Sequence, residues 1–213
     1  STCTRGAVNE RVVNVKVAII DYGMGNLYSV EQALIRLGAE VIVTNDEEVL
    51  NASDALVLPG VGAFPDAMMR LEDSGLANFI KQTKKPLIGI CLGMQLMFEQ
   101  SEEVRKTEGL GIFKGHIEKF KDVSRIPHMG WNDLQFTNDS NTEKRYVYFV
   151  HSFYAVDVSP EELVAFAEYE GVKVPAVVSK ENFTGMQFHP EKSGPVGMQL
   201  LQQWLEKAGA TVC

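Results

Sequence analysis

The 213-residue sequence has few cysteines, no long apolar run and no excess of positive charge. Its three cysteines, Cys3, Cys91 and Cys213, lack the even number and the spacing of a disulfide framework, which argues against a secreted scaffold and predicts a cytoplasmic location. No run approaches the ~18 apolar residues that a membrane span needs. A formal net charge of −8 argues against nucleic acid and anionic membranes, so the expected ligand is a small molecule or a protein.

The length of the chain fits one globular domain, which we expect to extend from residue 15 to residue 213. The first 14 residues, STCTRGAVNERVVN, contain no apolar centre of the kind found in signal peptides. We interpret residues 1–14 as a partly flexible N-terminal extension that precedes the domain.

The first half of the sequence alternates short apolar runs with segments of helical periodicity. Four runs rich in Val, Ile and Leu predict buried strands at residues 15–21, 39–45, 54–60 and 85–91. Apolar stripes predict a helix that ends at Gly38 and a second helical region after Pro65. Strands that alternate with helices indicate βαβ units, and hence a parallel sheet with helices on both faces.

The second half is rich in strand-like segments and has few helix signals. These segments are GIFKGHIEKF, YVYFVHSFYAV, LVAFAEYEG and VPAVVSKENFTGMQFHP. They predict antiparallel additions to the sheet, followed by a last helix over residues 195–208. The expected fold class is therefore α/β, with a mostly parallel central sheet, helices on both faces and antiparallel additions in the second half.

Cys91 lies where the last of the four predicted strands meets the helical stretch MQLMFEQ. Ligands of open α/β sheets bind beyond the carboxyl ends of the strands, so this position favours a functional cysteine. Gly89 and Gly93 flank it in the pattern G-x-C-x-G, which is typical of a nucleophile elbow, a strained strand-to-helix turn that needs small neighbours. The pattern alone leaves a buried core thiol open as the alternative.

A thiol nucleophile needs a base, and the sequence offers four histidines, His116, His128, His151 and His189. The last of these stands in FHPEKSG, where the following proline biases it toward extended backbone. His189 and Glu191 are two residues apart and can project to the same side, where the carboxylate would orient the imidazole. Cys91, His189 and Glu191 are thus the candidate catalytic triad. A surface turn with a solvated acid is the alternative for the His-Pro-Glu segment.

The combination of GICLGMQ with a distant FHPE resembles the class I, triad-type glutamine amidotransferases, whose fold is flavodoxin-like. Five further segments resemble, more specifically, the glutaminase subunits of imidazole glycerol phosphate synthase. They are DYGMGNLYSV, LPGVGAF, PHMGWN, YFVHSF and GMQFHPEKSG, which occur in this order from residue 21 to residue 194. Five separated motifs in order are far more specific than one. The resemblance covers the chain from about residue 15 onward.

The resemblance implies that the chain hydrolyses glutamine to glutamate and ammonia, with no cofactor and no metal. Cys91 would attack the side-chain amide of glutamine, and His189 would protonate the departing ammonia. Gly60, Val61 and Gly62 of the PGVG segment, together with the Leu92 backbone N–H, are the expected oxyanion donors. From the sequence alone, PGVG is equally a plain turn after a strand.

Five residues are expected to contact the substrate. Gln95 lies one helical turn beyond Cys91 and could face the same cleft, although an exposed polar residue is the alternative. The resemblance implies that Glu103 binds the α-amino group of glutamine and that His151, Ser152 and Phe153 supply backbone contacts. Apart from the resemblance, Glu103 is equally a charged residue at a helix end, and His151 equally a core histidine with its hydrogen bonds satisfied.

Little of the chain remains to bind a phosphorylated acceptor, because neither G-x-x-x-x-G-K nor G-x-G-x-x-G occurs at a strand–helix junction. The resemblance implies that ammonia passes to a (β/α)₈ cyclase in a heterodimer, where it yields imidazole glycerol phosphate and an aminoimidazole carboxamide ribonucleotide. It also places the motifs of Trp131 and Tyr148 on the face that meets this partner, and Lys192, which directly follows Glu191, is the third expected interface residue. Core packing of the two aromatic residues is the alternative.

Two other functions remain open. The subunit of another amidotransferase, for anthranilate or pyridoxal phosphate synthesis, would share the triad, although HMGWN and DYGMGNLYSV argue against it. A DJ-1-like redox or binding protein would also place a cysteine on such an elbow, but it would lack the distant His-Pro-Glu. Glutaminase activity with a purified partner distinguishes these classes.

Overall fold

A computed structural model of the chain describes residues 15–140 and 143–212. The predicted N-terminal extension, residues 1–14, lies outside the described residues. In the described part, no helix combines the length and the apolar character needed to cross a membrane.

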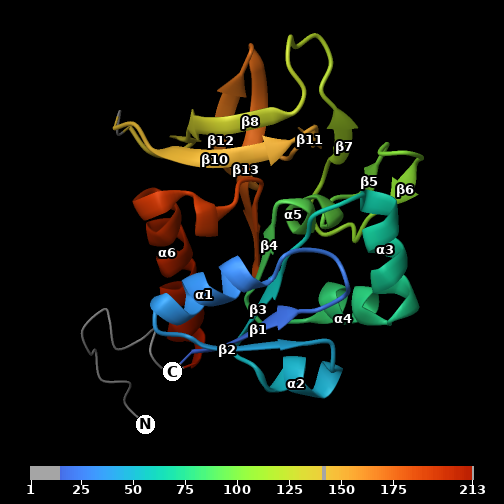
Figure 1. The fold of residues 1–213 in the computed structure, drawn as a ribbon, viewed down its shortest axis with the longest axis vertical. Coiled ribbons are helices and arrows are strands. Elements are labelled where there is room, and N and C mark those ends of the chain that lie inside the picture. The colour runs from blue at the N-terminus through green and yellow to red at the C-terminus, as the bar shows by residue number, and fades with distance from the viewer. Residues whose placement is uncertain (1–14, 141–142, 213) are drawn as a thin grey trace.

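The described residues form a central sheet of eight strands in the order β2-β1-β3-β4-β14-β13-β12-β9 (Figure 1). The first five strands are parallel and the last three antiparallel. Their bounds are β2 (Glu40–Thr44), β1 (Lys16–Ile20), β3 (Ala55–Leu58), β4 (Leu87–Ile90), β14 (Phe183–Met186), β13 (Val172–Lys180), β12 (Leu163–Tyr169) and β9 (Gln135–Phe136). This sheet confirms the predicted fold class, and its parallel half has the flavodoxin-like order 2-1-3-4 with β14 in fifth place.

Helices cover both faces of the sheet, as the alternation of apolar runs predicted. One face is covered by α1 (Tyr28–Arg36) and α6 (Gly194–Val212), the other by α2 (Glu47–Ala52), α3 (Phe64–Asp73), α4 (Leu76–Gln82) and α5 (Leu92–Leu96). Along β1 the side chains alternate between the two cores, since Val17 and Ile19 join the first core while Ala18 and Ile20 join the second. Burial on both faces explains why the strand is apolar throughout.

The structure corrects one local prediction and adds detail to the helices. Residues 39–45 were expected to form a buried strand, but β2 is an edge strand and Ile42 is 46% exposed. The helical region after Pro65 is two helices, because Gly75 adopts a left-handed φ of 80° and ends the first. Helix α2 had not been predicted, since it is short; the Asp46 side chain caps it by accepting a hydrogen bond from Glu48 N at 2.9 Å.

Strand β14 is the main departure from the predicted antiparallel second half. It pairs in parallel with β4, with Met186 opposite Ile90. The chain therefore returns to the middle of the sheet, and the carboxyl ends of β4 and β14 lie side by side. Because Cys91 follows β4 and His189 follows β14, this pairing brings the two halves of the predicted triad together.

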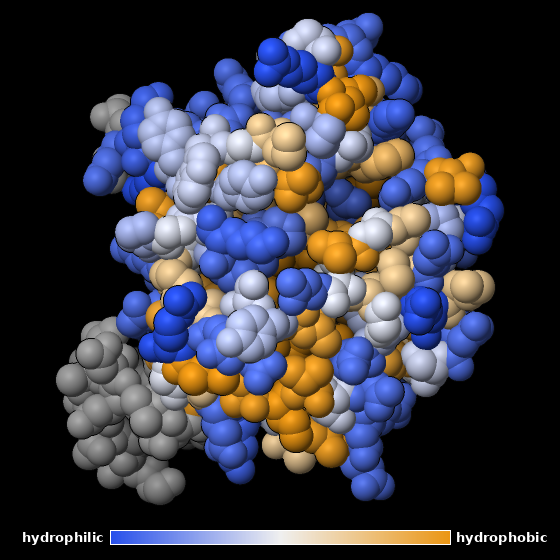
Figure 2. Space-filling view, viewed as in Figure 1, coloured by the Kyte–Doolittle hydropathy of each residue, from blue (hydrophilic) through white to orange (hydrophobic). Residues whose placement is uncertain are grey.

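The remaining strands form two small sheets above the carboxyl edge of the central sheet (Figure 1). They are β8 (His128–Asp133) with β10 (Tyr146–His151), and β11 (Phe153–Val156) with β7 (His116–Lys119), β5 (Gln100–Ser101) and β6 (Thr107–Glu108). Their pairings are antiparallel except that of β5 with β7, which is parallel. Figure 2 shows mostly hydrophilic side chains over this upper part of the molecule, with apolar ones between them. The antiparallel additions thus form a polar-surfaced layer above the functional edge.

Candidate active site

Cys91 occupies a strained turn between β4 and α5. Its φ of 55° and ψ of −114° lie outside the regions that residues with a side chain normally adopt. Two backbone hydrogen bonds hold it there, from Cys91 N to Met186 O at 2.8 Å and from Gln95 N to Cys91 O at 3.2 Å. The elbow is as predicted, but the helix behind it is shorter than the stretch MQLMFEQ suggested and ends at Leu96.

The two glycines around Cys91 are required by close backbone packing. A Cβ atom on Gly93 would lie 1.9 Å from Leu58 O, and one on Gly89 would lie 2.5 Å from Met97 Sδ and 2.8 Å from Gly93 O. The elbow therefore packs directly on the end of β3. This contact explains the G-x-C-x-G pattern physically, because any side chain at Gly93 would collide with backbone that cannot move alone.

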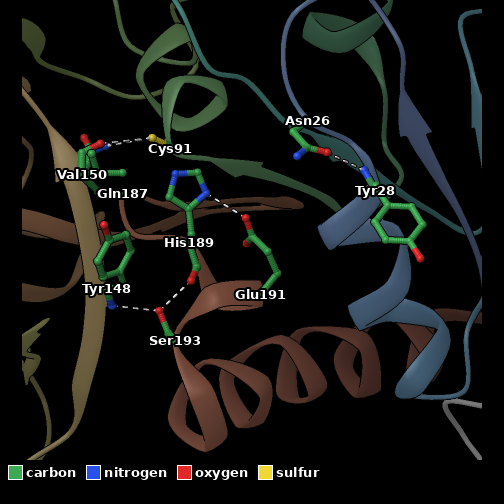
Figure 3. Close-up of polar contacts among 9 residues, drawn as sticks. All are labelled: Asn26, Tyr28, Cys91, Tyr148, Val150, Gln187, His189, Glu191 and Ser193. Atoms are coloured by element: carbon green, nitrogen blue, oxygen red, sulfur yellow. Dashed lines mark hydrogen bonds and ion pairs between the residues drawn. The ribbon is translucent and has the colours of Figure 1, made fainter. Parts of the chain in front are cut away.

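His189 and Glu191 form the second half of the site. His189 Nδ1 lies 2.8 Å from Glu191 Oε1, and both side chains are almost fully buried. Figure 3 shows the His189 ring between Cys91 and Glu191. Since the carboxylate accepts the Nδ1 proton, Nε2 is left on the thiol side, where it makes no hydrogen bond within the described residues. The arrangement is that of a nucleophile, a base and an orienting acid.

Charge in this site favours an ion pair. Burial lowers the pKa of the His189 imidazole, but Cys91 and Glu191 together outweigh that effect and raise this pKa to about 10. The imidazole is therefore protonated at neutral pH, between the Cys91 sulfur and the Glu191 carboxylate (Figure 3). A protonated imidazole can donate a proton to a leaving group without first removing one from the thiol.

A pocket of about 320 Å³ opens in front of the cysteine. It is lined by Val61, Gly62, Cys91, Leu92, Gln95, Glu103, Val150, His151, Ser152, Phe153 and His189. All five predicted substrate residues thus lie on the wall, together with three of the four predicted oxyanion residues. Its volume is at the lower end of small-molecule sites, which suits a ligand the size of an amino acid.

Gly60 is the predicted oxyanion residue that does not line the pocket. It lies behind the wall, where an added Cβ would meet Tyr22 Oη at 2.6 Å and Leu92 Cβ at 3.1 Å. The Tyr22 hydroxyl in turn donates to Pro59 O at 2.6 Å. Gly60 therefore lets the PGVG segment pack against the elbow, while Val61 and Gly62 reach the pocket.

Gln95 is buried and not an exposed residue of its helix. Its amide nitrogen donates to Phe153 O and to Gln187 Oε1, both at 3.0 Å. Glu103 also lines the pocket and accepts a hydrogen bond from Phe64 N at 3.0 Å. Burial raises the pKa of the Glu103 carboxyl, so a cationic partner in the pocket would stabilise its charged form.

His151 belongs to a chain of hydrogen bonds that fixes the segment above the pocket. Its Nδ1–H donates to Phe153 O at 2.8 Å, so its Nε2 must accept from His128 Nδ1 at 2.8 Å. His128 Nε2 then accepts from the Asn132 side-chain amide at 3.2 Å. Burial lowers the pKa of His128 to about 4 and that of His151 to about 3, so both are neutral. Neither is a candidate base.

This neutral histidine pair predicts a loss of stability in acid. The unfolded chain takes up protons on both histidines near pH 6.5, whereas the folded chain does so only near pH 4 and pH 3. The free energy of unfolding should therefore fall below pH 6.5, by up to about 1.4 kcal/mol per pH unit for each histidine. Urea unfolding from pH 7 to pH 4.5 measures this slope, which should be shallower in a His128→Gln variant. An unchanged slope would contradict neutral burial.

The three predicted interface residues lie close to the triad. Trp131 is 57% exposed and stands opposite the half-buried Tyr148 in the β8–β10 ladder. Their rings meet edge to face at a centroid distance of 6.0 Å. Lys192 is exposed and directly follows Glu191. The described structure thus excludes core packing for Trp131.

Sequence reasoning missed Gln187 and Val150. The Gln187 amide nitrogen lies 3.9 Å from Cys91 Sγ, and the Val150 carbonyl oxygen lies 4.0 Å from the same atom (Figure 3). A signal for Gln187 was present, because it precedes His189 by two residues in a strand-like segment and so shares its side. Val150 contributes only its backbone, so its side chain carries no signal.

The chain matches the family of class I glutamine amidotransferases over residues 18–208. It is similar to a crystal structure of a glutamine amidotransferase, with a TM-score of 0.71 and 18% identity, over 90% of this chain and 98% of that one. This low identity supports the fold alone.

Closer relatives are subunits of one enzyme. The chain is 54% identical to imidazole glycerol phosphate synthase subunit HisH of Exiguobacterium sibiricum, over 89% of this chain and 94% of that one. It is 50% identical to the HisH subunit of Geobacillus thermodenitrificans, with the same coverage. The chain therefore belongs to the class I glutamine amidotransferases and, within them, to the HisH subunits of imidazole glycerol phosphate synthase.

Proposed function

We propose that this chain hydrolyses glutamine at Cys91 and delivers the ammonia to a cyclase partner in histidine biosynthesis. The observation that carries the proposal is the arrangement of Cys91 and His189 at the adjacent ends of β4 and β14, with Glu191 bound to the imidazole at 2.8 Å. Membership of the HisH family supports the choice of glutamine as substrate.

The first half of the reaction releases ammonia. The Cys91 thiolate attacks the carbonyl carbon of the substrate's side-chain amide, and the imidazolium of His189 gives its proton to the amide nitrogen. The carbon–nitrogen bond breaks, ammonia leaves, and a γ-glutamyl thioester remains on the sulfur. Glu191 holds the imidazole through Nδ1, so Nε2 is the atom that transfers the proton.

The second half releases glutamate. Neutral His189 takes a proton from a water molecule, which attacks the thioester carbon. The carbon–sulfur bond breaks, and the sulfur leaves as a thiolate that again faces an imidazolium. The cycle thus returns His189 to the protonated form that its high pKa favours.

Backbone donors would stabilise the oxyanion in both halves. As the first residue of α5, Leu92 has an N–H without a partner inside its own helix. Val61 and Gly62 also line the pocket, in the segment that packs against the elbow. The Gly-Val-Gly backbone has little side-chain restraint, so we propose that the Val61 N–H turns inward when the partner binds its nucleotide.

Polar groups on the remaining walls would hold the ends of glutamine. Both amide hydrogens of Gln95 are used by Phe153 O and Gln187 Oε1, which leaves its carbonyl oxygen as an acceptor for the substrate. The Glu103 carboxylate would pair with the α-ammonium group. The backbone of residues 151–153, which also lines the pocket, would contact the substrate as well.

The proposed partner is a (β/α)₈ cyclase that adds the ammonia to a ribonucleotide and forms imidazole glycerol phosphate. HisH relatives are named as subunits of the synthase, which supports a second subunit. We place the complex in the cytoplasm, where a reducing environment keeps the Cys91 thiol free.

The interface prediction concerns Trp131, which is exposed beside the triad. Replacing it with alanine should weaken binding of the cyclase by about tenfold or more, because large exposed aromatic residues contribute most to such interfaces. Isothermal titration with the cyclase measures the affinity, and thermal melting checks the fold.

A matched control is Met69→Ala, which removes a 52% exposed apolar side chain on the distant helix α3. This variant should bind the cyclase like the unaltered chain. Equal affinity of the Trp131 and Met69 variants would rule out an interface role for Trp131.

The function itself is tested by glutamine hydrolysis with the purified cyclase and its nucleotide. Glutamate should form in equal amount to the cyclase product. Activity only with a partner from anthranilate or pyridoxal phosphate synthesis would instead identify a sister subunit. A chain that reacts with oxidants at Cys91 but never hydrolyses glutamine would support the redox alternative.

A further inference from the structure

Gln187 is a buried polar residue beside the nucleophile with no role in the reaction described above. Its side chain is fully buried, it directly follows β14, and it does not line the pocket. Its amide nitrogen lies 3.9 Å from Cys91 Sγ (Figure 3). Burying an amide costs free energy unless its polar atoms form hydrogen bonds, so both the nitrogen and the oxygen of this side chain need a partner.

The surrounding hydrogen bonds decide which end of the amide faces the sulfur. A backbone carbonyl can only accept, so the Gln95 atom that faces Phe153 O must be its nitrogen. The same nitrogen then donates to Gln187, which must present its oxygen to Gln95. The Gln187 nitrogen is therefore turned toward Cys91. This orientation is fixed by the Phe153 carbonyl, which can accept a hydrogen bond but cannot donate one.

The sulfur thus has both a donor and an acceptor within reach of a weak hydrogen bond. The Val150 carbonyl at 4.0 Å can only accept a hydrogen bond, so it favours the neutral thiol. The Gln187 amide can donate, so it favours the thiolate, and a charged sulfur would shorten and strengthen this contact. Removing the Gln187 donor would take away one of the groups that favour the thiolate, while the Val150 carbonyl would remain.

We propose that Gln187 is a positioning residue that holds an amide N–H toward the Cys91 thiolate, and that Gln95 fixes its orientation. The role in turnover rests on the proposed glutaminase function, whereas the contact with the sulfur does not depend on it. Gln95 therefore has two tasks, one toward the substrate and one toward the nucleophile. The thiolate is thus stabilised by a buried amide that does not contact the substrate.

The test combines thiol reactivity with kinetics. Gln187→Met keeps the approximate volume of the side chain and removes the donor. Alkylation of Cys91 by iodoacetamide in the isolated chain, followed as the Cys91 peptide by mass spectrometry, should reach half its maximal rate about one pH unit higher. In the complex with the cyclase, kcat for glutamine should fall about tenfold, while KM changes less than about twofold.

Asn182→Leu is the matched control. Asn182 also has a partly buried amide with two hydrogen bonds, to Thr83 O at 2.9 Å and Lys85 O at 2.8 Å, but it lies at the opposite end of β14. This variant should lose stability without a change in the pH dependence of alkylation. An unchanged alkylation profile in folded Gln187→Met would overturn the proposal, even if glutamine hydrolysis fell.

A measurement on the unaltered chain does not depend on the folding of any variant. The side-chain ¹⁵N–¹H signals of one glutamine amide should shift as Cys91 ionises, and that shift should vanish in Cys91→Ala. If no glutamine amide follows the titration of Cys91, the proposed contact is absent. If the contact is present but glutamine is not hydrolysed, the proposed function fails and this inference stands without its kinetic consequence.

Discussion

Replacing Cys91 with alanine should lower glutamine-dependent synthesis by the complex by about 10⁴-fold or more. The sulfur forms the bond to the substrate, and alanine offers no atom that can do so. Synthesis from added ammonia should continue at the unaltered rate, because the proposed acceptor chemistry takes place on the cyclase. Both rates are measured on one preparation, with glutamine or an ammonium salt as the nitrogen source.

The fold of this variant must be verified, because residue 91 adopts a φ of 55° that alanine also tolerates poorly. Thermal melting and binding of the cyclase serve as controls, and Cys91→Ser provides a second variant with a poorer nucleophile. Loss of both activities in a folded and associated variant would contradict the division of labour between the two subunits.

Replacing His189 with alanine should have the second largest effect, again about 10⁴-fold on glutamine-dependent synthesis. Without the imidazolium, the thiolate loses its counter-charge and the amide nitrogen must leave unprotonated. Because Cys91 and His189 act as a unit, a double alanine variant should be no slower than either single variant. A further large loss in the double variant would show that the two residues act independently.

Replacing Glu191 with glutamine should be milder, with a loss of about 10²–10³-fold in kcat. The amide oxygen of glutamine can still accept the His189 Nδ1 proton and so preserve the 2.8 Å contact. The charge that helps to raise the pKa of His189 is lost, so the imidazolium becomes less favourable. Activity as low as that of Cys91→Ala would mean that Glu191 does more than orient the imidazole.

The parts of this site that could be predicted are those set by local sequence. The elbow follows from Gly89 and Gly93 around Cys91, because packing on β3 at Gly93, and on Met97 and Gly93 at Gly89, leaves no space for a Cβ. The contact of His189 with Glu191 follows from their spacing. Continuous apolar runs and apolar helical periodicity likewise predicted the fold class. The runs are continuous because both faces of a parallel sheet are buried.

The parts that could not be predicted depend on contacts between distant segments. The parallel pairing of β14 with β4 brings His189 to Cys91, and the β14 sequence does not distinguish parallel from antiparallel neighbours. Gly60 was expected on the pocket wall, but Tyr22 and Leu92 pack against it from behind. The edge position of β2 similarly depends on strand order, to which its own residues give no clue.

The central claim is that Cys91 carries the glutamyl group during turnover. It is tested by acid-quenching the complex with the cyclase and its nucleotide while glutamine is being consumed, followed by mass spectrometry of the cysteine-containing peptides. We expect a γ-glutamyl thioester on the Cys91 peptide and no thioester in the Cys91→Ser variant. The amount of trapped thioester should be larger when deacylation is slow. Turnover with no adduct on Cys91, or with an adduct on another residue, would contradict it.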